Sequence, residues 1–258
     1  MSALAPRILA AGAACVVVLS CGDVPTFAGG IVYISSVVLP SPVVAAGDKL
    51  RDSTGKVAPL QVLAYDTAGK VIPNVMATFV ISSIPSGGAT IDASGVLTAN
   101  DSIRTLQIVG RVGASLQTAA ILLDIVPQPD SIELSGTVDS LVVFKNTSAL
   151  RVRVTGVRGG SRVGVKGIVV RYQITKVNGA PSVDSSLVKL VDGTLSTLRS
   201  DPRRAVDTTD ASGVAGRVLV PGQTGMTSAE VEARATNLAG VPLRGSPYRF
   251  VLVAKKGS

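Results

Sequence analysis

The stretch VDTTDASGVA, residues 206–215, joins an extended β-branched segment to a tight turn and to the start of a second extended segment. An Asp placed before Ser-Gly is typical of a turn in which the carboxylate accepts hydrogen bonds from the backbone that follows it. The same five letters, DASGV, occur at residues 92–96 and again lead into an extended run. The pattern predicts strands joined by tight turns, and the recurrence indicates two copies of one unit.

Around both copies of this motif, apolar and polar residues alternate with the period of a strand. In residues 60–65 the even-numbered positions can face a core, and in residues 150–154 apolar side chains alternate with Arg151 and Arg153. Turn signals rich in Gly, Pro, Asn and Ser separate the runs. In the first half we expect about seven short strands, and the clearest runs are Tyr33–Leu39, Leu60–Asp66, Val75–Ser82, Leu106–Val112 and Thr118–Val126. The second half has eight: Ser131–Leu134, Leu141–Phe144, Leu150–Val157, Ile168–Thr175, Leu187–Val191, Val214–Val220, Ala229–Thr236 and Tyr248–Val253.

A short proline-containing segment divides the two series of strands. Pro127 and Pro129 lack backbone donors and hold an extended conformation, so residues 127–130 are predicted to form a stiff linker. We therefore expect an all-β fold with one domain over residues 31–126, a second over residues 131–254, and a basic tail at 255–258.

A second pair of segments repeats between the halves. Residues 68–75, followed by Phe79, parallel residues 160–168, followed by Tyr172. This order of strand, glycine loop, aromatic strand and DASGV turn resembles the bacterial immunoglobulin-like (Big) domains of invasin and intimin, with residues 206–215 the closest match. The resemblance implies two tandem Ig-like β-sandwiches, which serve in that family as spacers, stalks or adhesive tips. The chain has no Trp and lacks the disulfide pair of antibody domains.

The amino terminus carries a different signal. Ile8 to Leu19 form an apolar run that is too short to span a bilayer and suits a secretory signal peptide, which we place at residues 1–20. The segment Val18-Leu19-Ser20-Cys21 resembles the bacterial lipobox. This resemblance implies that Cys21 receives a lipid and begins the mature chain, with residues 21–30 as a flexible lead. Two alternatives remain: cleavage by the ordinary signal peptidase after Ala28, or an incidental thiol at Cys21.

The lipobox also predicts where the protein is located. We expect an exported lipoprotein tethered to a membrane, and Gly22 followed by Asp23 does not match the inner-membrane retention signal of enterobacteria. The prediction is therefore the outer membrane, on its periplasmic face or at the cell surface. Cys15 lies in the segment that is removed, so the mature chain can form no intramolecular disulfide.

Composition argues against most kinds of catalysis. The chain has no His, which excludes Ser-His-Asp triads, Cys-His dyads and imidazole metal ligands. Asp92, Asp207 and Asp210 could supply oxygen ligands to calcium, but their spacing does not match a calcium loop, and turn formation is the simpler role. We therefore predict a protein that is not an enzyme, with no cofactor, no catalytic residue and no metal site.

Charge is unevenly distributed. Residues 22–129 carry 6 basic and 7 acidic side chains, whereas residues 130–258 carry 18 and 10. Because stacking aromatics do not accompany the arginines, nucleic acid is not expected as a partner. One hypothesis is contact with an envelope polyanion through Arg199, Arg203 and Arg204, in the long connection from Lys176 to Asp207. The alternative is a solvated face whose charges prevent edge pairing.

The sequence thus predicts a lipid-anchored protein of the cell envelope that acts as a non-catalytic binding, adhesion or spacer module. Its partners would be the membrane and an envelope polyanion, a glycan or another envelope protein. The competing function is that of an accessory subunit, docked through exposed strand edges on a larger envelope assembly.

Overall fold

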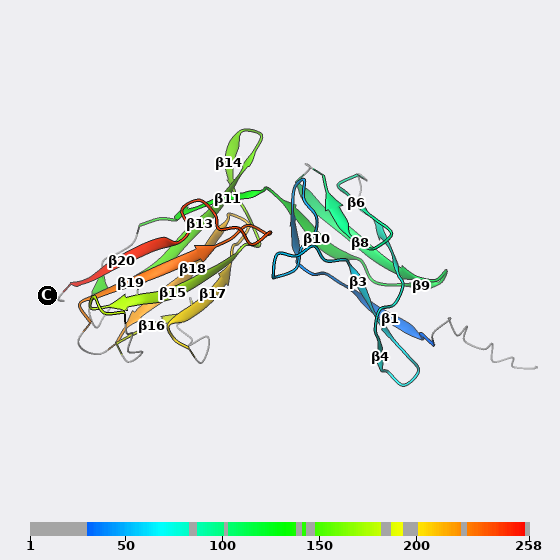
Figure 1. Ribbon diagram of the computed structural model, residues 1–258, viewed down its shortest axis with the longest axis horizontal. Coiled ribbons are helices and arrows are strands. Elements are labelled where there is room, and N and C mark those ends of the chain that lie inside the picture. Colours follow the sequence, from blue (N-terminus) through cyan, green and yellow to red (C-terminus); the bar gives the residue numbers. More distant parts are fainter. Residues whose placement is uncertain are drawn as a thin grey trace, which may run out of the picture.

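The computed structural model describes residues 30–82, 87–100, 103–137, 141–142, 148–181, 187–192, 201–222 and 226–255. Within these ranges the chain is built of strands and turns, which confirms the predicted all-β class (Figure 1). No helix in the described part is long and apolar enough to cross a membrane. The predicted signal peptide, the lipobox with Cys21, the start of the lead and the end of the basic tail lie outside the described residues.

The first half of the chain forms two facing sheets and a hairpin, which we call the N-terminal sandwich (residues 31–126). One sheet has the order β1-β3-β4, and the other has the order β2-β10-β8-β5 with β9 paired to β8. Their bounds are β1 Tyr33–Val38, β2 Val43–Ala45, β3 Gln61–Tyr65, β4 Val71–Ile72, β5 Thr78–Ile81, β8 Arg104–Val112, β9 Leu116–Gln117 and β10 Ile121–Val126. The hairpin consists of β6 Ala89–Ile91 and β7 Leu97–Ala99.

The second half forms the C-terminal sandwich (residues 129–255), also of two sheets. The first sheet has the order β11-β13-β18-β16 with β14 paired to β13, and the second has the order β12-β20-β19-β15-β17. Their bounds are β11 Pro129–Leu134, β12 Leu141–Val142, β13 Ser148–Arg158, β14 Ser161–Gly164, β15 Val169–Val177, β16 Val188–Val191, β17 Arg204–Thr208, β18 Val214–Pro221, β19 Ser228–Ala235 and β20 Tyr248–Lys255.

Alternation along the strands produces the core. Leu150, Val152 and Val154 of β13 are fully buried and belong to the same apolar cluster as Tyr172 of β15, on the opposing sheet. The Tyr172 hydroxyl donates a hydrogen bond to the Ala215 carbonyl oxygen at 2.8 Å, so this side chain joins the two sheets. Burial raises the pKa of the Tyr172 phenol well above its ordinary value, which keeps the group neutral. Tyr172 thereby crosses the core, which holds neither Trp nor a disulfide.

The repeated DASGV segments have the same geometry. Oδ1 of Asp210 accepts hydrogen bonds from the Ser212 amide at 2.8 Å, the Ser212 hydroxyl at 2.6 Å and the Val214 amide at 3.0 Å. Asp92 makes the equivalent bonds, at 2.9, 2.6 and 3.0 Å. The serine hydroxyl is the largest of the influences that lower the pKa of each carboxyl below its ordinary value. The duplication inferred from the letters is therefore also a duplication of turn structure.

Three further turns use the same carboxylate or amide geometry without the full DASGV sequence. They begin at Asp52, Asp66 and Asn237, and in each a side-chain Oδ1 accepts backbone amides two and four residues ahead. A glycine with positive φ occupies the fourth position of every one. Of these three turns, only the one with Gly69 overlaps a repeated segment named from the sequence, residues 68–75.

Several short elements differ from the sequence predictions. Six short strands were not predicted, because alternation is hard to recognise over two to four residues. They are β2, β4, β6, β7, β9 and β14. The connection predicted between Lys176 and Asp207 contains β17 in addition to the expected β16, so Arg204 lies on a strand instead of a loop. Strand β11 begins at Pro129, and only Pro127 and Gln128 separate it from β10.

Candidate functional site

The predicted anion-binding arginines are only partly described. Arg199 and Cys21 lie outside the described residues. Arg203 and Arg204 are exposed and share one acidic neighbour: Arg203 Nε lies 3.0 Å from Asp201 Oδ1, and Arg204 Nε lies 3.8 Å from Asp201 Oδ2. The hydrogen bond from Arg203 lowers the pKa of Asp201, so this carboxylate is charged and offsets part of the local positive charge.

The two aspartates considered for calcium have separate roles. Asp210 closes its turn through Oδ1, whereas Asp207 Oδ2 accepts the Gly216 amide at 2.7 Å and lies 3.1 Å from the Arg217 guanidinium. Among the described residues, no group of three or more acidic or Cys side chains is placed to hold a metal ion. The geometry of both carboxylates is that of structural hydrogen-bond acceptors.

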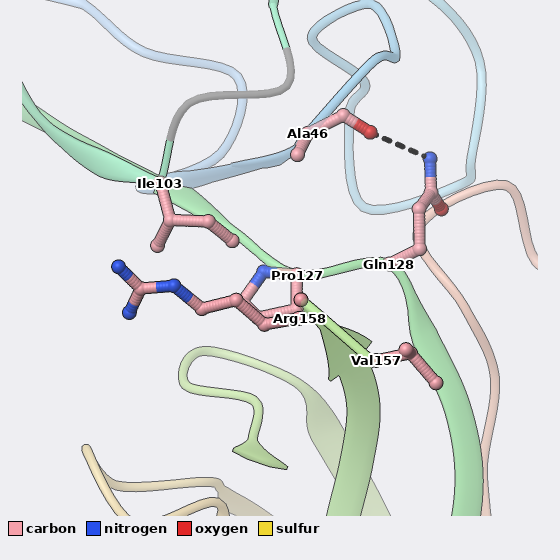
Figure 2. A pocket seen from close by; sticks show the side chains of 7 residues that line it. Ala46, Ile103, Pro127, Gln128, Val157 and Arg158 are labelled. Atoms are coloured by element: carbon pink, nitrogen blue, oxygen red, sulfur yellow. Dashed lines mark hydrogen bonds between the residues drawn. The ribbon is translucent and has the colours of Figure 1, made fainter. Parts of the chain in front are cut away.

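The most distinctive surface lies where the two sandwiches meet. Val43 of β2 is only 2% exposed and belongs to the apolar cluster of the C-terminal sandwich. It lies against Gly167, where an added Cβ would come within 2.5 Å of Val43 Cγ1. The Gln128 amide donates to the Ala46 carbonyl oxygen at 3.0 Å (Figure 2), and Lys166 Nζ lies 2.6 Å from Asp124 Oδ2. Apolar packing, a hydrogen bond and an ion pair thus connect the halves.

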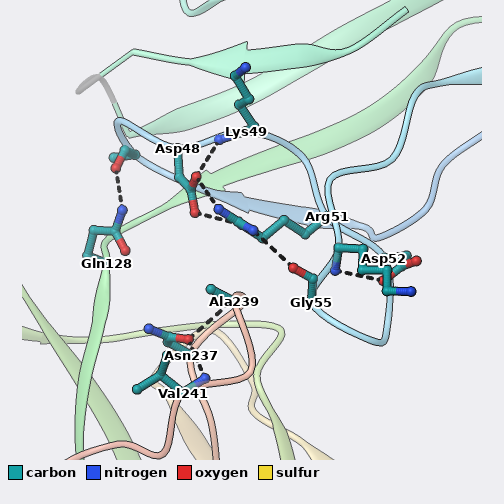
Figure 3. A network of polar contacts seen from close by, with 11 residues as sticks. Asp48, Lys49, Arg51, Asp52, Gly55, Gln128, Asn237, Ala239 and Val241 are labelled. Atoms are coloured by element: carbon teal, nitrogen blue, oxygen red, sulfur yellow. Dashed lines mark hydrogen bonds and ion pairs between the residues drawn. The ribbon is translucent and has the colours of Figure 1, made fainter.

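A second contact joins two of the glycine turns (Figure 3). Arg51 holds the first turn by donating to both Asp48 carboxylate oxygens at 3.1 Å and to the Gly55 carbonyl at 2.9 Å. A Cβ on Gly55 would lie 2.8 Å from the Ala239 carbonyl carbon, so the turn at 237–241 packs directly against it. Burial raises the pKa of Asp48, but Arg51 and the Lys49 amide more than offset this, and the net pKa is lowered.

Between these contacts the junction opens into a groove with a volume of about 530 Å³, which we call the basic groove. It contains five cationic side chains and one acidic side chain. The cations are Arg104, Arg153, Arg158, Arg162 and Lys166, and the acid is Asp124. A second hollow of about 490 Å³ adjoins the basic groove and shares three lining residues with it, Ile103, Pro127 and Arg158. Figure 2 shows the Arg158 side chain extending beneath Ile103.

Local structure explains how the groove acquires its charge. Arg153 and Arg158 lie on β13, Arg162 lies on β14, and Lys166 follows β14, so one hairpin supplies four cations. Arg104 begins β8 of the other sandwich. Residues 130–258 carry the excess positive charge expected from the sequence, and the groove gathers arginines of this half outside the connection from Lys176 to Asp207, where Arg199, Arg203 and Arg204 were expected to bind an anion. The usable signal was the density of cations in residues 151–166, immediately beyond the Pro127 segment.

Asp124 gives the junction a pH dependence. Burial raises its pKa, but hydrogen bonds from Lys166 Nζ and from the Thr105 hydroxyl at 2.5 Å more than offset this and lower the pKa below 3.8. A lowered native pKa contributes stability above the unfolded value, and this contribution is lost as the pH falls through the native value.

We expect Asp124→Asn to destabilise the protein at pH 6 by about 1 kcal/mol or less, because the pair is partly solvated. The difference from wild type should begin to shrink as the pH falls below the ordinary pKa of an aspartate and should vanish only below the lowered native pKa of Asp124, which urea unfolding across this range measures. Lys166→Gln, the matched variant at the partner residue, should show the same convergence. A difference that stays constant with pH would contradict this role for the ion pair.

The comparisons with known proteins gave structural matches only. No protein-family model matches the chain, and no curated protein matches it. The adhesin InvE of Yersinia pseudotuberculosis is 13% identical, with 88% of this chain and 60% of that chain covered and a TM-score of 0.41. The Escherichia coli adhesin FdeC is 18% identical, with coverage of 85% and 63% and a TM-score of 0.33. The D00-D0 domains of intimin are 13% identical, with coverage of 85% and 98% and a TM-score of 0.29. The chain spans about three fifths of the InvE and FdeC structures.

Proposed function

We propose that this chain is a lipid-anchored, non-catalytic protein of the bacterial cell envelope, in which two interlocked β-sandwiches hold a binding surface at a fixed distance from the membrane. The observation that carries the proposal is the junction, where apolar, hydrogen-bonded and ionic contacts join the halves. A module that only tethers could use a flexible connection, whereas fixed contacts serve a protein that must present a surface in a defined position.

The arrangement of the molecule fits such a spacer. In Figure 1 strand β1 starts at the end of the N-terminal sandwich that faces away from the junction, and strand β20 runs to the opposite end of the molecule. The lead of residues 21–30 can reach at most about 35 Å when extended. If Cys21 is lipidated, the junction lies one sandwich beyond this lead, held out from the bilayer.

The side chains support a binding role over a catalytic one. The sequence has no His, and among the described residues that line the basic groove the one acid, Asp124, is engaged with Lys166 and Thr105. An acid held by two donors is a poor general base, because its pKa is lowered. The groove instead offers a cluster of fixed positive charges, which is suited to holding an anion.

The anchor is tested by metabolic labelling with a radioactive fatty acid. We expect label in the wild-type protein and in Cys15→Ser, and complete loss of label and of membrane association in Cys21→Ser. Mass spectrometry should find Cys21 as the first residue of the mature chain. An unlabelled mature protein that begins after Ala28 would overturn the anchor.

Fractionation extends the same experiment to location and to the competing function. We expect the labelled protein in the outer-membrane fraction. Protease treatment of intact cells then distinguishes the cell surface from the periplasmic face. Co-purification of a stoichiometric envelope protein in mild detergent would instead favour an accessory subunit of a larger assembly.

A further inference from the structure

We propose that the basic groove is a binding site for phosphate groups, on a ligand that contacts both sandwiches at once. This inference deepens the proposed binding role and rests on it, but it does not depend on the lipid anchor. The groove is lined by Arg104, Thr105 and Asp124 from the N-terminal sandwich and by the cations of the β13–β14 hairpin from the C-terminal sandwich. It therefore exists only where the two halves meet.

The cations of the groove differ in how many of their side-chain donors are already paired with other residues. Lys166 is paired with Asp124, and Arg162 contacts the Ser131 hydroxyl at 2.7 Å and two carboxylates at 3.4–3.5 Å. Arg153 uses only its Nε, which donates a hydrogen bond to the Ser212 carbonyl oxygen at 3.2 Å. The guanidinium of Arg158 has no hydrogen bond or ion pair to any described residue. The terminal guanidinium nitrogens of Arg153 and the side-chain donors of Arg158 thus remain available to a ligand.

The chemistry of the lining favours phosphate over other ligands. Guanidinium groups present paired donors that match the oxygens of a phosphate, and such charge-assisted bonds are short and strong. The described lining residues have a formal net charge of about four, which the two carboxylates beside Arg162 partly offset, and the remaining positive excess suits a ligand that carries more than one negative charge. The lining contains no aromatic side chain, so a base or a sugar ring would find no stacking surface.

Binding across the junction has a further consequence. A phosphate held between the two sandwiches would add contacts that exist only in the joined arrangement, and it would stabilise that arrangement by linkage. Two sources share this chemistry: the phosphate of a lipid head group and the phosphate of a water-soluble compound or glycan.

The test uses the full chain in nonionic detergent, titrated with pyrophosphate by calorimetry at low ionic strength. We compare the wild type with Arg153→Gln/Arg158→Gln and with a matched control, Arg203→Gln/Arg204→Gln, which removes the same charge at the cluster selected from the sequence. The expected result is at least tenfold weaker binding in the groove variant and less than a twofold change in the control. Binding should weaken steeply with added salt.

Two measurements keep the test decisive. Circular dichroism verifies that both variants remain folded, and Arg158→Gln alone, which removes no side-chain hydrogen bond or ion pair to a described residue, should weaken binding in the same direction. Competition by phosphatidylglycerol in the micelle, with phosphatidylcholine as its control, assigns a lipid head group, whereas undisturbed pyrophosphate binding assigns a soluble phosphate. Absence of binding, or equal losses in the two double variants, would overturn the groove. Either result would leave the anchor experiment unaffected.

Discussion

Gly213→Ala should destabilise the C-terminal sandwich severely, whereas Gly95→Ala, the same change in the matching turn of the N-terminal sandwich, should have a modest effect. Both glycines have nearly the same φ, +81° and +82°, so the backbone strain of placing a side chain there is equal. That strain is about 1–2 kcal/mol for a non-glycine residue. The surroundings of the two turns decide the difference.

Backbone atoms surround Gly213 closely. An added Cβ would lie 2.5 Å from the Val154 carbonyl oxygen and 2.7 Å from both Gly164 Cα and the Val165 amide nitrogen, and none of these can move without disrupting β13 or β14. At Gly95 the nearest atoms are the Leu60 oxygen at 3.2 Å and a Phe79 ring carbon at 3.3 Å. We therefore expect a loss of roughly 4 kcal/mol or more for Gly213→Ala.

Urea unfolding followed by far-ultraviolet circular dichroism measures both variants. Gly69→Ala is the control, since its φ is +74° and no atom lies within 4 Å of an added Cβ. It should cost no more than the strain alone. Equal losses at Gly95 and Gly213 would show that the turn around Gly213 is not held against the β13–β14 hairpin as described.

Local pattern was sufficient to predict most of the longer strands and the repeated turn. The alternation at Leu150, Val152 and Val154 identified the buried face of β13 correctly, and the DASGV letters identified two turns whose hydrogen bonds are equivalent. The turn at Asn237 was missed because Leu238 and Ala239 replace the residues that made DASGV recognisable. Turn structure here depends on an Oδ1 atom and a glycine, and less on the residues between them.

The junction could not be predicted from the sequence. Gln128 and Ala46 are 82 residues apart, and nothing local to either indicates the other. The alternation along β13 places Arg153 on the face opposite the core, as the sequence indicates. Its position in a groove with Arg104 depends on where the N-terminal sandwich lies, which the local sequence does not indicate. The expectation of an anion site at Arg199, Arg203 and Arg204 stays a prediction, and Asp201 partly neutralises the last two of these residues.

Gly167→Ala should loosen the junction. The residue has a φ of +81°, and its added Cβ would lie within 3.3 Å of three side-chain carbons of Val43, a β-branched residue with little rotamer freedom. Gly160→Ala is the matched control, because its φ of +80° imposes the same strain while no atom lies within 4 Å. The control should keep the junction closed, whereas Gly167→Ala should separate Val43 from the core it enters.

The distance between the two sandwiches tests the account most directly. Spin labels at Leu122→Cys on β10 and Val251→Cys on β20, both exposed strand positions, report this distance in a chain with Cys15 and Cys21 changed to Ser. We predict one narrow distance distribution, unchanged in Gly160→Ala and markedly broadened in Gly167→Ala. A broad distribution in the parent protein, with no response to Gly167→Ala, would contradict a fixed junction and the groove built upon it.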